Sequence, residues 1–337
     1  MPGGMPTYRS QRGVALLIAI LLVAFGTIIA AAMAYNNAMT ARRAASTFEF
    51  DQAVLVAQGA EAIAAYGLQQ SAKQNYPDTD TSQPWAQQLP SMEVMPGVTL
   101  DASMEDLQGR FNLNDLVGTD GNTPNTAAIA AFQRLLTSLN LEPKYADYLV
   151  DWIDKNTDPM FPDGAEDSVY MELDPPYRTP NMPITSTSEL LALPGFTRAD
   201  FDRLAPYIVA LPLGVGINTC DAAPQLIDAI TGTQQFSADP QQFAQQRQQA
   251  GGCFPTPADV QTAASNVQGG SGSLGTSPST SGQNPQQSIS SILTQKSSWF
   301  RLTSYVTLGS AEFAVYTTLY EDPTGLARPV LRSFTPN

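Results

Sequence analysis

The residues that most clearly suggest chemistry are the carboxylates of DYLVDWIDKNTDPMFPDGAEDSVYMELD, residues 147–174. Nine carboxylates share this segment with a single cation, Lys155. Asp154, Asn156 and Asp158 form the pattern D-x-N-x-D, in which alternate side chains of a turning loop can surround Ca²⁺, a hard cation that prefers oxygen ligands. The segment therefore predicts a calcium site.

The expected site is not an EF-hand. Pro159 stands where an EF-hand loop has its glycine, and Glu166 falls one residue late for the terminal bidentate ligand. The alternative is a solvated acidic loop without metal, because clustered like charges repel and stay in water. For the calcium interpretation we expect four best ligands and two further ones, in this order: Asp154, Asp158, Glu166, Asp167, then Asn156 and Asp163.

The two cysteines, Cys220 and Cys253, are the only thiols in the chain. In a domain exported to an oxidising compartment they can pair, and the closed loop would contribute roughly 3–4 kcal/mol of stability in the chain-entropy model. In a reducing cytosol they would remain two free thiols. The stretch between them is rich in Gln, Pro and Gly, and it has little apolar content to hold it otherwise.

Composition argues against several classes of function. The chain has no histidine, so the commonest general base and transition-metal ligand are absent. Its formal net charge of −14 disfavours nucleic acid, whose phosphates need Lys and Arg. Paired carboxylates can hydrolyse glycosides, but only across a sugar-binding cleft that nothing in the sequence predicts. We therefore expect a protein that is not an enzyme and has no nucleic-acid partner.

The chain that holds these residues has a long apolar segment near its start, QRGVALLIAILLVAFGTIIAAAMAY, residues 11–35. Residues 14–34 are apolar except for Gly26 and Thr27, and at about 1.5 Å per residue a helix of this length spans about 30 Å, the thickness of a bilayer core. A secretory signal has a shorter apolar region followed by a small-residue cleavage site, which Ala30–Ala32 could imitate. The helical pattern, however, continues to about Gln70, with its apolar residues spaced for one face: Phe48, Val54, Leu55, Ala62 and Ile63.

Composition shifts divide the rest of the chain. Prolines and polar residues break the helix over 71–90, two strands are expected in 91–113, and mostly helical segments follow to 232. Residues 262–290 are of low complexity and are expected to be mobile. Aromatic and β-branched residues then predict strands over 298–335. The economical architecture is a small sheet whose strands flank an inserted helical domain.

Within the helical part, TSTSELLALPGFTRADFDRLAPYI, residues 185–208, has the form of a helix-hairpin-helix. Pro194 and Gly195 make the hairpin, and Thr187 or Ser188 can cap the first helix. GINTCDAAPQLIDAI (216–230) echoes RFNLNDL (110–116) and suggests a repeated unit. Because only Arg198 and Arg203 lie near the hairpin of this acidic chain, we expect a packing module or protein-contact surface and not a DNA-binding one.

The start of the chain resembles the class III leader of type IV pilins and pseudopilins. A short basic leader ends in Gly13, and the hydrophobic helix begins at once with Val14, which implies cleavage between these residues by prepilin peptidase and methylation of Val14. Most such proteins carry Glu at the fifth mature position, where this chain has Ile18. An intramembrane carboxylate is costly and is kept only where it has a partner, so its absence suits a filament tip, where no subunit precedes.

The whole chain resembles the K-type minor pseudopilins of type II secretion systems (general secretion pathway protein K). The matching segments are RGVALL, GRFNLNDL, DYLVDWID, DGAEDSVYMELDPPYRTPN, TSELLALPGF and GINTCDAAPQLIDAI. The resemblance implies an α+β fold in which a long N-terminal transmembrane and amphipathic helix packs on a small pilin-type antiparallel sheet, with a large helix-hairpin-helix-like domain inserted between strands. It also implies calcium bound in that domain.

The domains expected on this basis are a leader, a membrane segment, the helix continuation with the first strands, the helical insert and the last strands, at residues 1–13, 14–35, 36–105, 106–290 and 291–337. The resemblance implies I-type and J-type minor pseudopilins, the major pseudopilin filament and the inner membrane as partners. It places a single-pass protein in the inner membrane of a Gram-negative bacterium, with its C-terminal domain in the periplasm. The alternative is a soluble periplasmic calcium-binding protein released by ordinary signal-peptide cleavage.

Overall fold

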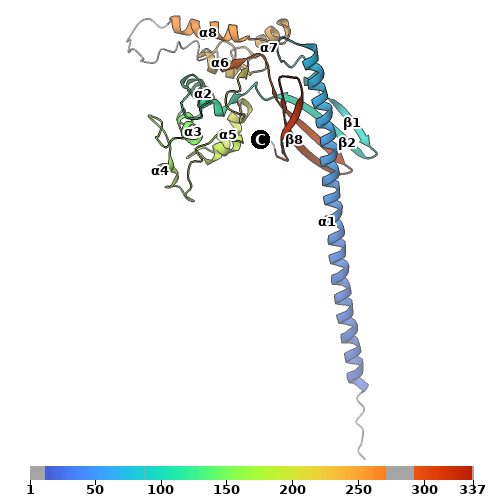
Figure 1. Cartoon of the computed structure of the whole chain (residues 1–337). Helices are drawn as coiled ribbons and strands as arrows, with labels where there is room; N and C mark the ends of the chain where they lie inside the picture. Colours follow the sequence, from blue (N-terminus) through green and yellow to red (C-terminus); the bar gives the residue numbers. More distant parts are fainter. Residues whose placement is uncertain (1–11, 88, 271–291, 336–337) are drawn as a thin grey trace, which may run out of the picture. The chain divides into compact units, whose positions relative to one another are not determined.

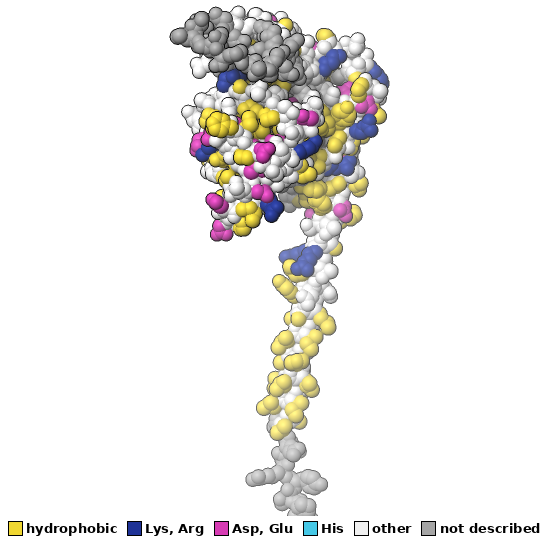
Figure 2. Space-filling model, turned by 60° about the vertical axis from the view of Figure 1, so that its left-hand side comes forward, with side chains coloured by type: hydrophobic (Ala, Val, Ile, Leu, Met, Phe, Trp, Pro, Cys, Tyr) yellow, Lys and Arg dark blue, Asp and Glu magenta, His cyan; other side chains and the backbone are white. Residues whose placement is uncertain are grey.

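The computed structural model describes residues 12–87, 89–270 and 292–335. The chain divides into two units, Met1–Leu55 and Val56–Asn337. The described residues of the first unit form the N-terminal part of helix α1 (Arg12–Gln74). Its apolar side chains are exposed (Figure 2), and α1 contains an 18-residue stretch with a mean hydropathy of 2.9, none of it buried. By length and composition this helix can cross a membrane.

The second unit begins with the last turns of α1, which pack on a five-stranded antiparallel sheet (Figure 1). Small buried residues, Ala57, Ala60 and Ala64, recur along this part of α1 at helical spacing and let the backbone approach the strands. The strand order is β1-β2-β7-β8-β9, with these bounds: β1 Leu89–Met95, β2 Val98–Asp106, β7 Trp299–Leu308, β8 Ala311–Glu321 and β9 Ala327–Ser333.

The sheet is made of strands from the two ends of the second unit. β2 pairs with β7 over its whole length, from Val98 opposite Leu308 to Asp106 opposite Phe300. The α+β fold with a helical domain inserted between neighbouring strands is therefore confirmed.

The insert contains short helices around one apolar core. Its α-helices are α2 Thr126–Ser138, α3 Tyr145–Ile153, α4 Asp167–Tyr170, α5 Arg198–Leu204, α6 Pro224–Thr231, α7 Pro240–Gln249 and α8 Pro257–Gly270. Its short strands pair in parallel, β3 Phe111–Asn112 with β4 Ile208–Val209 and β5 Ile217–Asn218 with β6 Leu293–Thr294. The 3₁₀ segments of the second unit are η1 Pro84–Ala86, η2 Leu113–Leu116, η3 Thr187–Ala192 and η4 Ala205–Tyr207.

The two echoed sequences have similar local structures. The Asn112 side chain accepts a hydrogen bond from the Asn114 N–H, and the Asn218 side chain accepts one from the Cys220 N–H. After β3 the helical segment η2 follows at once, whereas after β5 the turn residues 219–223 come before α6. An asparagine side chain that bonds the backbone two residues ahead is a common way to fix such a turn.

The helix-hairpin-helix form is present, with Gly195 at a φ of 78° in the hairpin between η3 and α5. The expected caps, Thr187 and Ser188, are wrong: Ser186 is the N-cap of η3 and shares a capping box with Glu189. The Gly195 carbonyl accepts a hydrogen bond from Tyr145 Oη at 3.0 Å, so the hairpin packs on the first turn of α3.

The two arginines beside the hairpin are engaged within α5. Arg198 pairs with Asp202 at 2.8 Å and Arg203 with Asp200 at 2.6 Å. These pairs leave the hairpin without the uncompensated cations that a phosphate would need.

One expectation for the insert is wrong in part. Residues 262–270, expected to be mobile and of low complexity, belong to helix α8, whose Val260 and Ala263 are buried in the core of the insert. The Ala and Gln residues of this stretch favour a helix, and burial of that face stabilises it. Residues 271–290 of the same segment lie outside the described residues.

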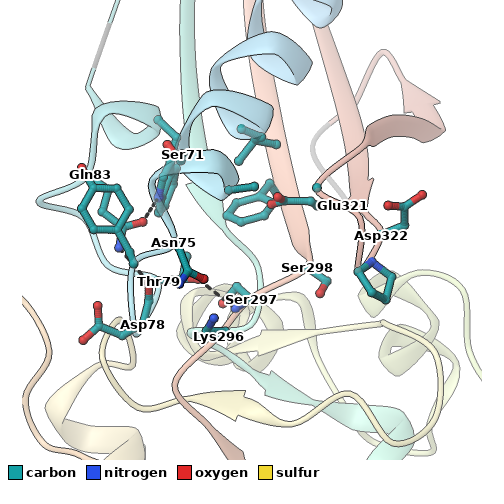
Figure 3. Close-up of a pocket in the computed structure, with 17 residues that line it drawn as sticks. Ser71, Asn75, Asp78, Thr79, Gln83, Lys296, Ser297, Ser298, Glu321 and Asp322 are labelled. Carbon is teal, nitrogen blue, oxygen red and sulfur yellow. Dashed lines mark hydrogen bonds between the residues drawn. The ribbon is translucent and has the colours of Figure 1, made fainter.

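Where α1 ends, the chain turns through residues 75–87 towards β1 and borders a cavity of about 250 Å³ (Figure 3). Asn75, at a φ of 53°, makes this turn in the left-handed region that asparagine tolerates. The other walls of the cavity are the start of β7 and the loop between β8 and β9.

Candidate metal centre

The end of α3 presents the first acidic residue of the candidate site. Asp154 is the C-cap of α3 and is only 2% exposed. One carboxylate oxygen, Oδ2, accepts a hydrogen bond from Asn156 Nδ2 at 2.8 Å, whereas the other, Oδ1, is buried without a partner. Burial raises the pKa of Asp154, and the charge of Asp158 adds to this. A cation beside Oδ1 would supply what the protein leaves missing.

The start of α4 presents the second group. Glu166 is the N-cap of α4 and is buried, with Oε2 accepting from Thr179 Oγ1 at 3.2 Å and Oε1 without a partner. Asp167 Oδ1 accepts from the backbone N–H of Thr179 at 3.1 Å. Burial, together with the charges of Asp154 and Asp167, raises the pKa of Glu166. The charges of the carboxylates at the end of α3 and the start of α4 thus act on one another.

Asn181 is a further residue at this place that no sequence pattern indicates. It has a φ of 49°, its Nδ2 donates to the Asn156 carbonyl at 2.9 Å, and its Oδ1 is buried without a partner. Its only signal in the sequence is its place at the end of DGAEDSVYMELDPPYRTPN. Asn181 therefore adds a third unpaired buried oxygen, on a side chain that contacts Asn156.

Asp151 lies one turn before Asp154 and is fully buried. The Met160 N–H donates to both oxygens of its carboxylate, to Oδ1 at 2.9 Å and to Oδ2 at 3.1 Å. A Cβ atom added to Gly164 would lie only 2.4 Å from Asp151 Oδ2. Burial raises the pKa of Asp151 to about 7, and the charges of Glu166 and Asp154 contribute. Asp151 holds the loop between α3 and α4 in place, and only glycine fits at position 164.

Two of the expected ligands are exposed to solvent. Asp158 is exposed, and its own N–H donates to Asn156 Oδ1 at 2.7 Å. Asp163 is also exposed, and its charge acts on Asp147 and raises the pKa of that residue. The structure thus places Asp154, Asn156 and Asp158 along one cavity, and Glu166 and Asp167 at the start of α4, where their charges act on one another and on Asp154. Asp163 does not line that cavity.

The unpaired oxygens suit a hard cation, with one geometric restriction. Among the described residues, the only three Asp, Glu or Cys side chains with ligand atoms all within 4.8 Å of one another are Asp78, Cys220 and Cys253. The carboxylates of Asp154, Glu166 and Asp167 do not converge to that extent. A calcium ion here would therefore need amide and backbone oxygens beside the carboxylates, as calcium sites commonly use.

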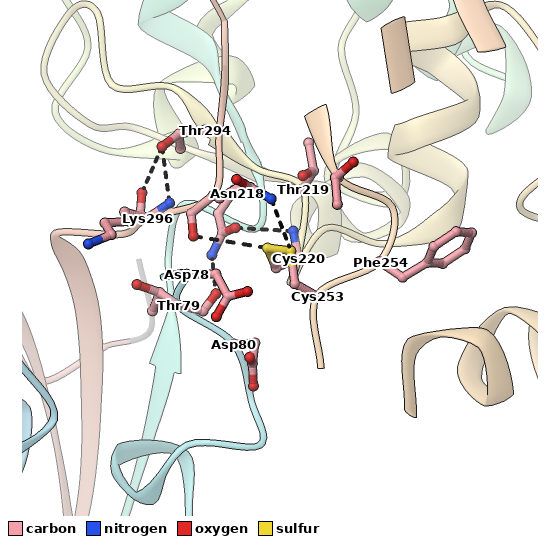
Figure 4. The surroundings of a disulfide bond; sticks show 12 residues. Asp78, Thr79, Asp80, Asn218, Thr219, Cys220, Cys253, Phe254, Thr294 and Lys296 are labelled. Atoms are coloured by element: carbon pink, nitrogen blue, oxygen red, sulfur yellow. Dashed lines mark hydrogen bonds between the residues drawn. A yellow bond between two sulfur atoms is a disulfide. The ribbon is translucent and has the colours of Figure 1, made fainter. Parts of the chain in front are cut away.

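Cys220 and Cys253 form a buried disulfide (Figure 4). It joins the turn after β5 to the segment between α7 and α8. Arg247 ties the same two segments, since Nε donates to the Phe254 carbonyl at 2.9 Å and Nη2 to the Ala222 carbonyl at 2.9 Å. The sulfurs are thus part of the scaffold of the insert and are not free to bind metal.

The predicted leader cleavage point falls at the start of α1. Gly13 and Val14 lie in its first turn, and residues 1–11 of the leader lie outside the described residues. Ile18 is 53% exposed on the apolar surface of the helix.

Comparisons with known proteins agree with these observations. A family model described as "Type II secretion system (T2SS), protein K" matches residues 109–213. The chain is 38% identical to type II secretion system protein K of Klebsiella pneumoniae over 218 residues, 62% of this chain and 66% of that protein. It is 32% identical to the protein K of Pseudomonas aeruginosa (69% and 71%) and 30% identical to that of Pectobacterium carotovorum subsp. carotovorum (90% of both).

A solved structure has the same fold. It is the crystal structure of the GspK-GspI-GspJ complex from the enterotoxigenic Escherichia coli type 2 secretion system. The match has a TM-score of 0.69 and 20% identity, and it covers 86% of this chain and 98% of the solved one.

Proposed function

The chain belongs to the type II secretion system protein K family, and we propose that it caps the tip of the periplasmic pseudopilus of such a system and assists export of folded proteins across the outer membrane. The observation that carries this proposal is the bulky insert between β2 and β7, combined with a membrane-length helix. A filament of close-packed helices can accommodate such an insert at one end more readily than at every level.

Ile18 supports the same position. In pilins the glutamate of the fifth mature position is thought to neutralise the N-terminal amine of a neighbouring subunit. Ile18 has no charge to offer, so a subunit that carries it need not have another one above it. An uncharged side chain there also avoids the cost of an unpaired carboxylate in the bilayer.

The proposed partners are I-type and J-type minor pseudopilins, together with the major pseudopilin filament. Support comes from the fold shared with a chain of the GspK-GspI-GspJ complex and from exposed apolar residues along α1. Phe48 is 71% exposed and Leu55 67%, although both lie beyond the membrane-length segment. Such residues at helical spacing suit packing against neighbouring helices.

We assign the protein to the inner membrane, with one spanning helix and its second unit in the periplasm. Prepilin peptidase would cleave between Gly13 and Val14, and Val14 would be methylated. We also propose that the protein is a structural component and not an enzyme. The released calcium-binding periplasmic protein, the alternative considered from the sequence, is not supported by the family relationship.

We propose calcium as the cofactor, held by Asp154, Glu166 and Asn181 with help from Asn156 or Asp167. When bound, the ion would supply the positive charge that these buried oxygens lack and would hold α3, α4 and the segment near residue 181 together. The support is the three oxygen atoms without donors, since a buried unpaired polar atom destabilises a fold.

Mass spectrometry of the protein from membranes tests the processing that this function requires. An N-terminus at Val14 that carries a methyl group is expected, and a start near residue 33 would instead indicate ordinary secretion.

Co-purification of the full-length protein with I-type and J-type subunits from the same secretion system tests the partners. Failure to retain either subunit would contradict the proposed place in the tip.

A further inference from the structure

The cavity at the end of α1 is not used by any of the functions proposed above. Figure 3 shows its walls, which come from four separate segments of the second unit. Part of its lining is aromatic: Trp85 and Phe300 meet edge to face, with ring centroids 5.0 Å apart. The other side chains that line it are largely polar or charged.

Several of the polar groups around the cavity are bonded to one another. Gln83 Nε2 donates to the Asp78 carbonyl at 2.8 Å, and Gln83 Oε1 accepts from Trp85 Nε1 at 3.0 Å. The Ser297 N–H donates to Thr79 Oγ1 at 3.1 Å. These groups have partners and do not call for a ligand.

Ser71 differs from them. Threonines elsewhere in α1 donate to a carbonyl one turn earlier, as Thr40 does to Asn36 at 2.9 Å and Thr47 to Arg43 at 3.0 Å. Ser71 lines the cavity and is only 8% exposed, yet its Oγ has no hydrogen-bond partner. A buried hydroxyl without a partner is costly unless something else in the cavity bonds to it.

Glu321 is the second group without a partner. Its carboxylate lines the cavity and makes no hydrogen bond or ion pair with the described residues. Burial raises the pKa of Glu321 to about 7, and the charge of Asp322 adds to this, whereas Lys296 acts in the opposite direction. Asp322 itself is already paired, with Arg328 at 2.9 Å. Glu321 is thus a partly desolvated carboxylate that a cation would stabilise.

We propose that this cavity binds a primary ammonium group, the side chain of a lysine presented by another polypeptide, with Glu321 as its counter-ion and Ser71 Oγ as a hydrogen-bond acceptor. An ammonium carries three donors, which matches a carboxylate and a hydroxyl that both lack one. The rings of Trp85 and Phe300 suit the apolar stem of a lysine and the charge at its end. The net charge of −14 attracts a cationic segment.

Lys296 is an internal competitor for the same carboxylate. It lines the cavity, and its side chain is exposed and forms no ion pair with the described residues. Its charge reduces the free energy gained when a second cation enters. Removal of the Lys296 charge should therefore strengthen binding of an external ammonium, whereas removal of the Glu321 charge should weaken it.

The test uses the full-length protein in detergent micelles and isothermal titration with N-acetyl-lysine methylamide. Its neutral isostere, N-acetyl-norleucine methylamide, is titrated in parallel. Saturable binding of the lysine compound at one site is expected, with at least tenfold weaker binding of the norleucine compound. Equal binding of the two, or no binding of the lysine compound, would overturn the proposal.

Three variants locate the site. Glu321→Gln should weaken binding at least tenfold, and Lys296→Met should strengthen it about threefold. Glu312→Gln, on the exposed part of the same strand, is the matched control and should leave binding unchanged. If Glu321→Gln fails to fold, Ser71→Ala replaces it, with at least threefold weaker binding expected. Unchanged binding in the folded Glu321 or Ser71 variant, or an equal loss in Glu312→Gln, would reject the cavity as the site.

Discussion

At the scale of single residues, the chemistry of the acidic segment depends on buried oxygens without donors. Asp154 Oδ1, Glu166 Oε1 and Asn181 Oδ1 are all shielded from solvent and unpaired. Leaving a polar atom buried and unpaired costs about 1–3 kcal/mol, and more when the group is charged. A hard cation at this place would convert a destabilising arrangement into a stabilising one.

The first prediction concerns that cation. Calcium at 100 times its dissociation constant should stabilise the full-length protein by about 2.7 kcal/mol, because it binds only the folded state. Asp154→Asn combined with Glu166→Gln should abolish this gain in thermal or urea unfolding. Asp163→Asn, an exposed carboxylate of the same loop, is the control and should keep it. An identical unfolding curve in EDTA and in excess calcium would contradict the site.

The second prediction concerns Asp106, at the end of β2. It accepts hydrogen bonds from the Gln108 N–H at 2.7 Å and from Asn218 Nδ2 at 2.8 Å, and so joins the sheet to the insert. Burial raises its pKa to about 7, with the charge of Asp221 adding to the effect. In the unfolded state the Asp106 carboxyl has a pKa near 3.9 and is ionised above about pH 4. Between about pH 4 and 7 the folded state therefore holds a proton on Asp106 that the unfolded state does not.

The free energy of unfolding should consequently fall as the pH rises from about 4 to 7. Above about pH 7, Asp106 should cause little further change in it. Asp115, Asp221 and Glu321, whose pKa values burial raises to about 6, 6 and 7, contribute in the same direction. Urea midpoints at pH 5 and pH 8, at fixed calcium, measure the slope. Asp106→Asn should reduce it, and an unaltered slope would show that Asp106 does not carry this proton.

At the scale of elements, patterns extended over many residues predicted the structure well. The long helix, the strands at 298–335 and the helix-hairpin-helix all follow from periodicity or turn chemistry that spans several turns or residues. The pairs β3–β4 and β5–β6 were missed because two-residue strands carry no periodic signal. Phe48, Leu55 and Ile63, spaced for one face, are exposed, whereas the residues of α1 buried in the second unit include Ala57, Ala60, Ala64, Glu61 and Leu68.

The third prediction concerns the contact between α1 and the edge strand β9. The buried Glu61 accepts hydrogen bonds from Arg332 at 2.7 and 2.8 Å and from Thr317 Oγ1 at 2.8 Å. Arg332→Ala removes two of the hydrogen bonds to the Glu61 carboxylate. A buried group left without a partner costs about 1–3 kcal/mol, and we expect a loss of stability at the lower end of this range because Arg332 is partly exposed to solvent.

A double-mutant cycle in urea isolates the pair. Glu61→Gln combined with Arg332→Ala should be less destabilised than the sum of the single variants, since no unpaired charge remains. Additive effects would show that the two side chains are not energetically coupled.

The fourth prediction concerns the disulfide between the β5 turn and the segment after α7. Cys220 and Cys253 are 33 residues apart, and loss of the bond should destabilise the protein by about 3–4 kcal/mol on the chain-entropy model. Unfolding in urea with and without reductant measures the difference. The Cys220→Ser, Cys253→Ser variant is the control and should not respond to reductant. Stoichiometric thiol labelling of denatured, unreduced protein would contradict the bond.

At the scale of the whole molecule, the sequence indicates residues 147–174 as the place for the proposed metal site more easily than it indicates which atoms would form it. The D-x-N-x-D spacing indicated the loop after α3 and ranked Asp158 with the best ligands, and in the structure Asp158 is exposed whereas Asp154 is buried. Asn181 comes from a segment that reaches the site only through the turns after α4. Local spacing carries no information about such a return of the chain, and a lone asparagine has no distinctive pattern.

The central claim is the place of the chain at the tip of the pseudopilus, and photo-crosslinking of the assembled filament tests it most directly. Benzoylphenylalanine is introduced in place of Phe48, an exposed residue on α1, and the adducts are identified by mass spectrometry. We predict adducts with an I-type or J-type minor pseudopilin, and about one copy of this chain per filament. Adducts with the major pseudopilin at regular intervals along the shaft, and none with minor pseudopilins, would contradict the account.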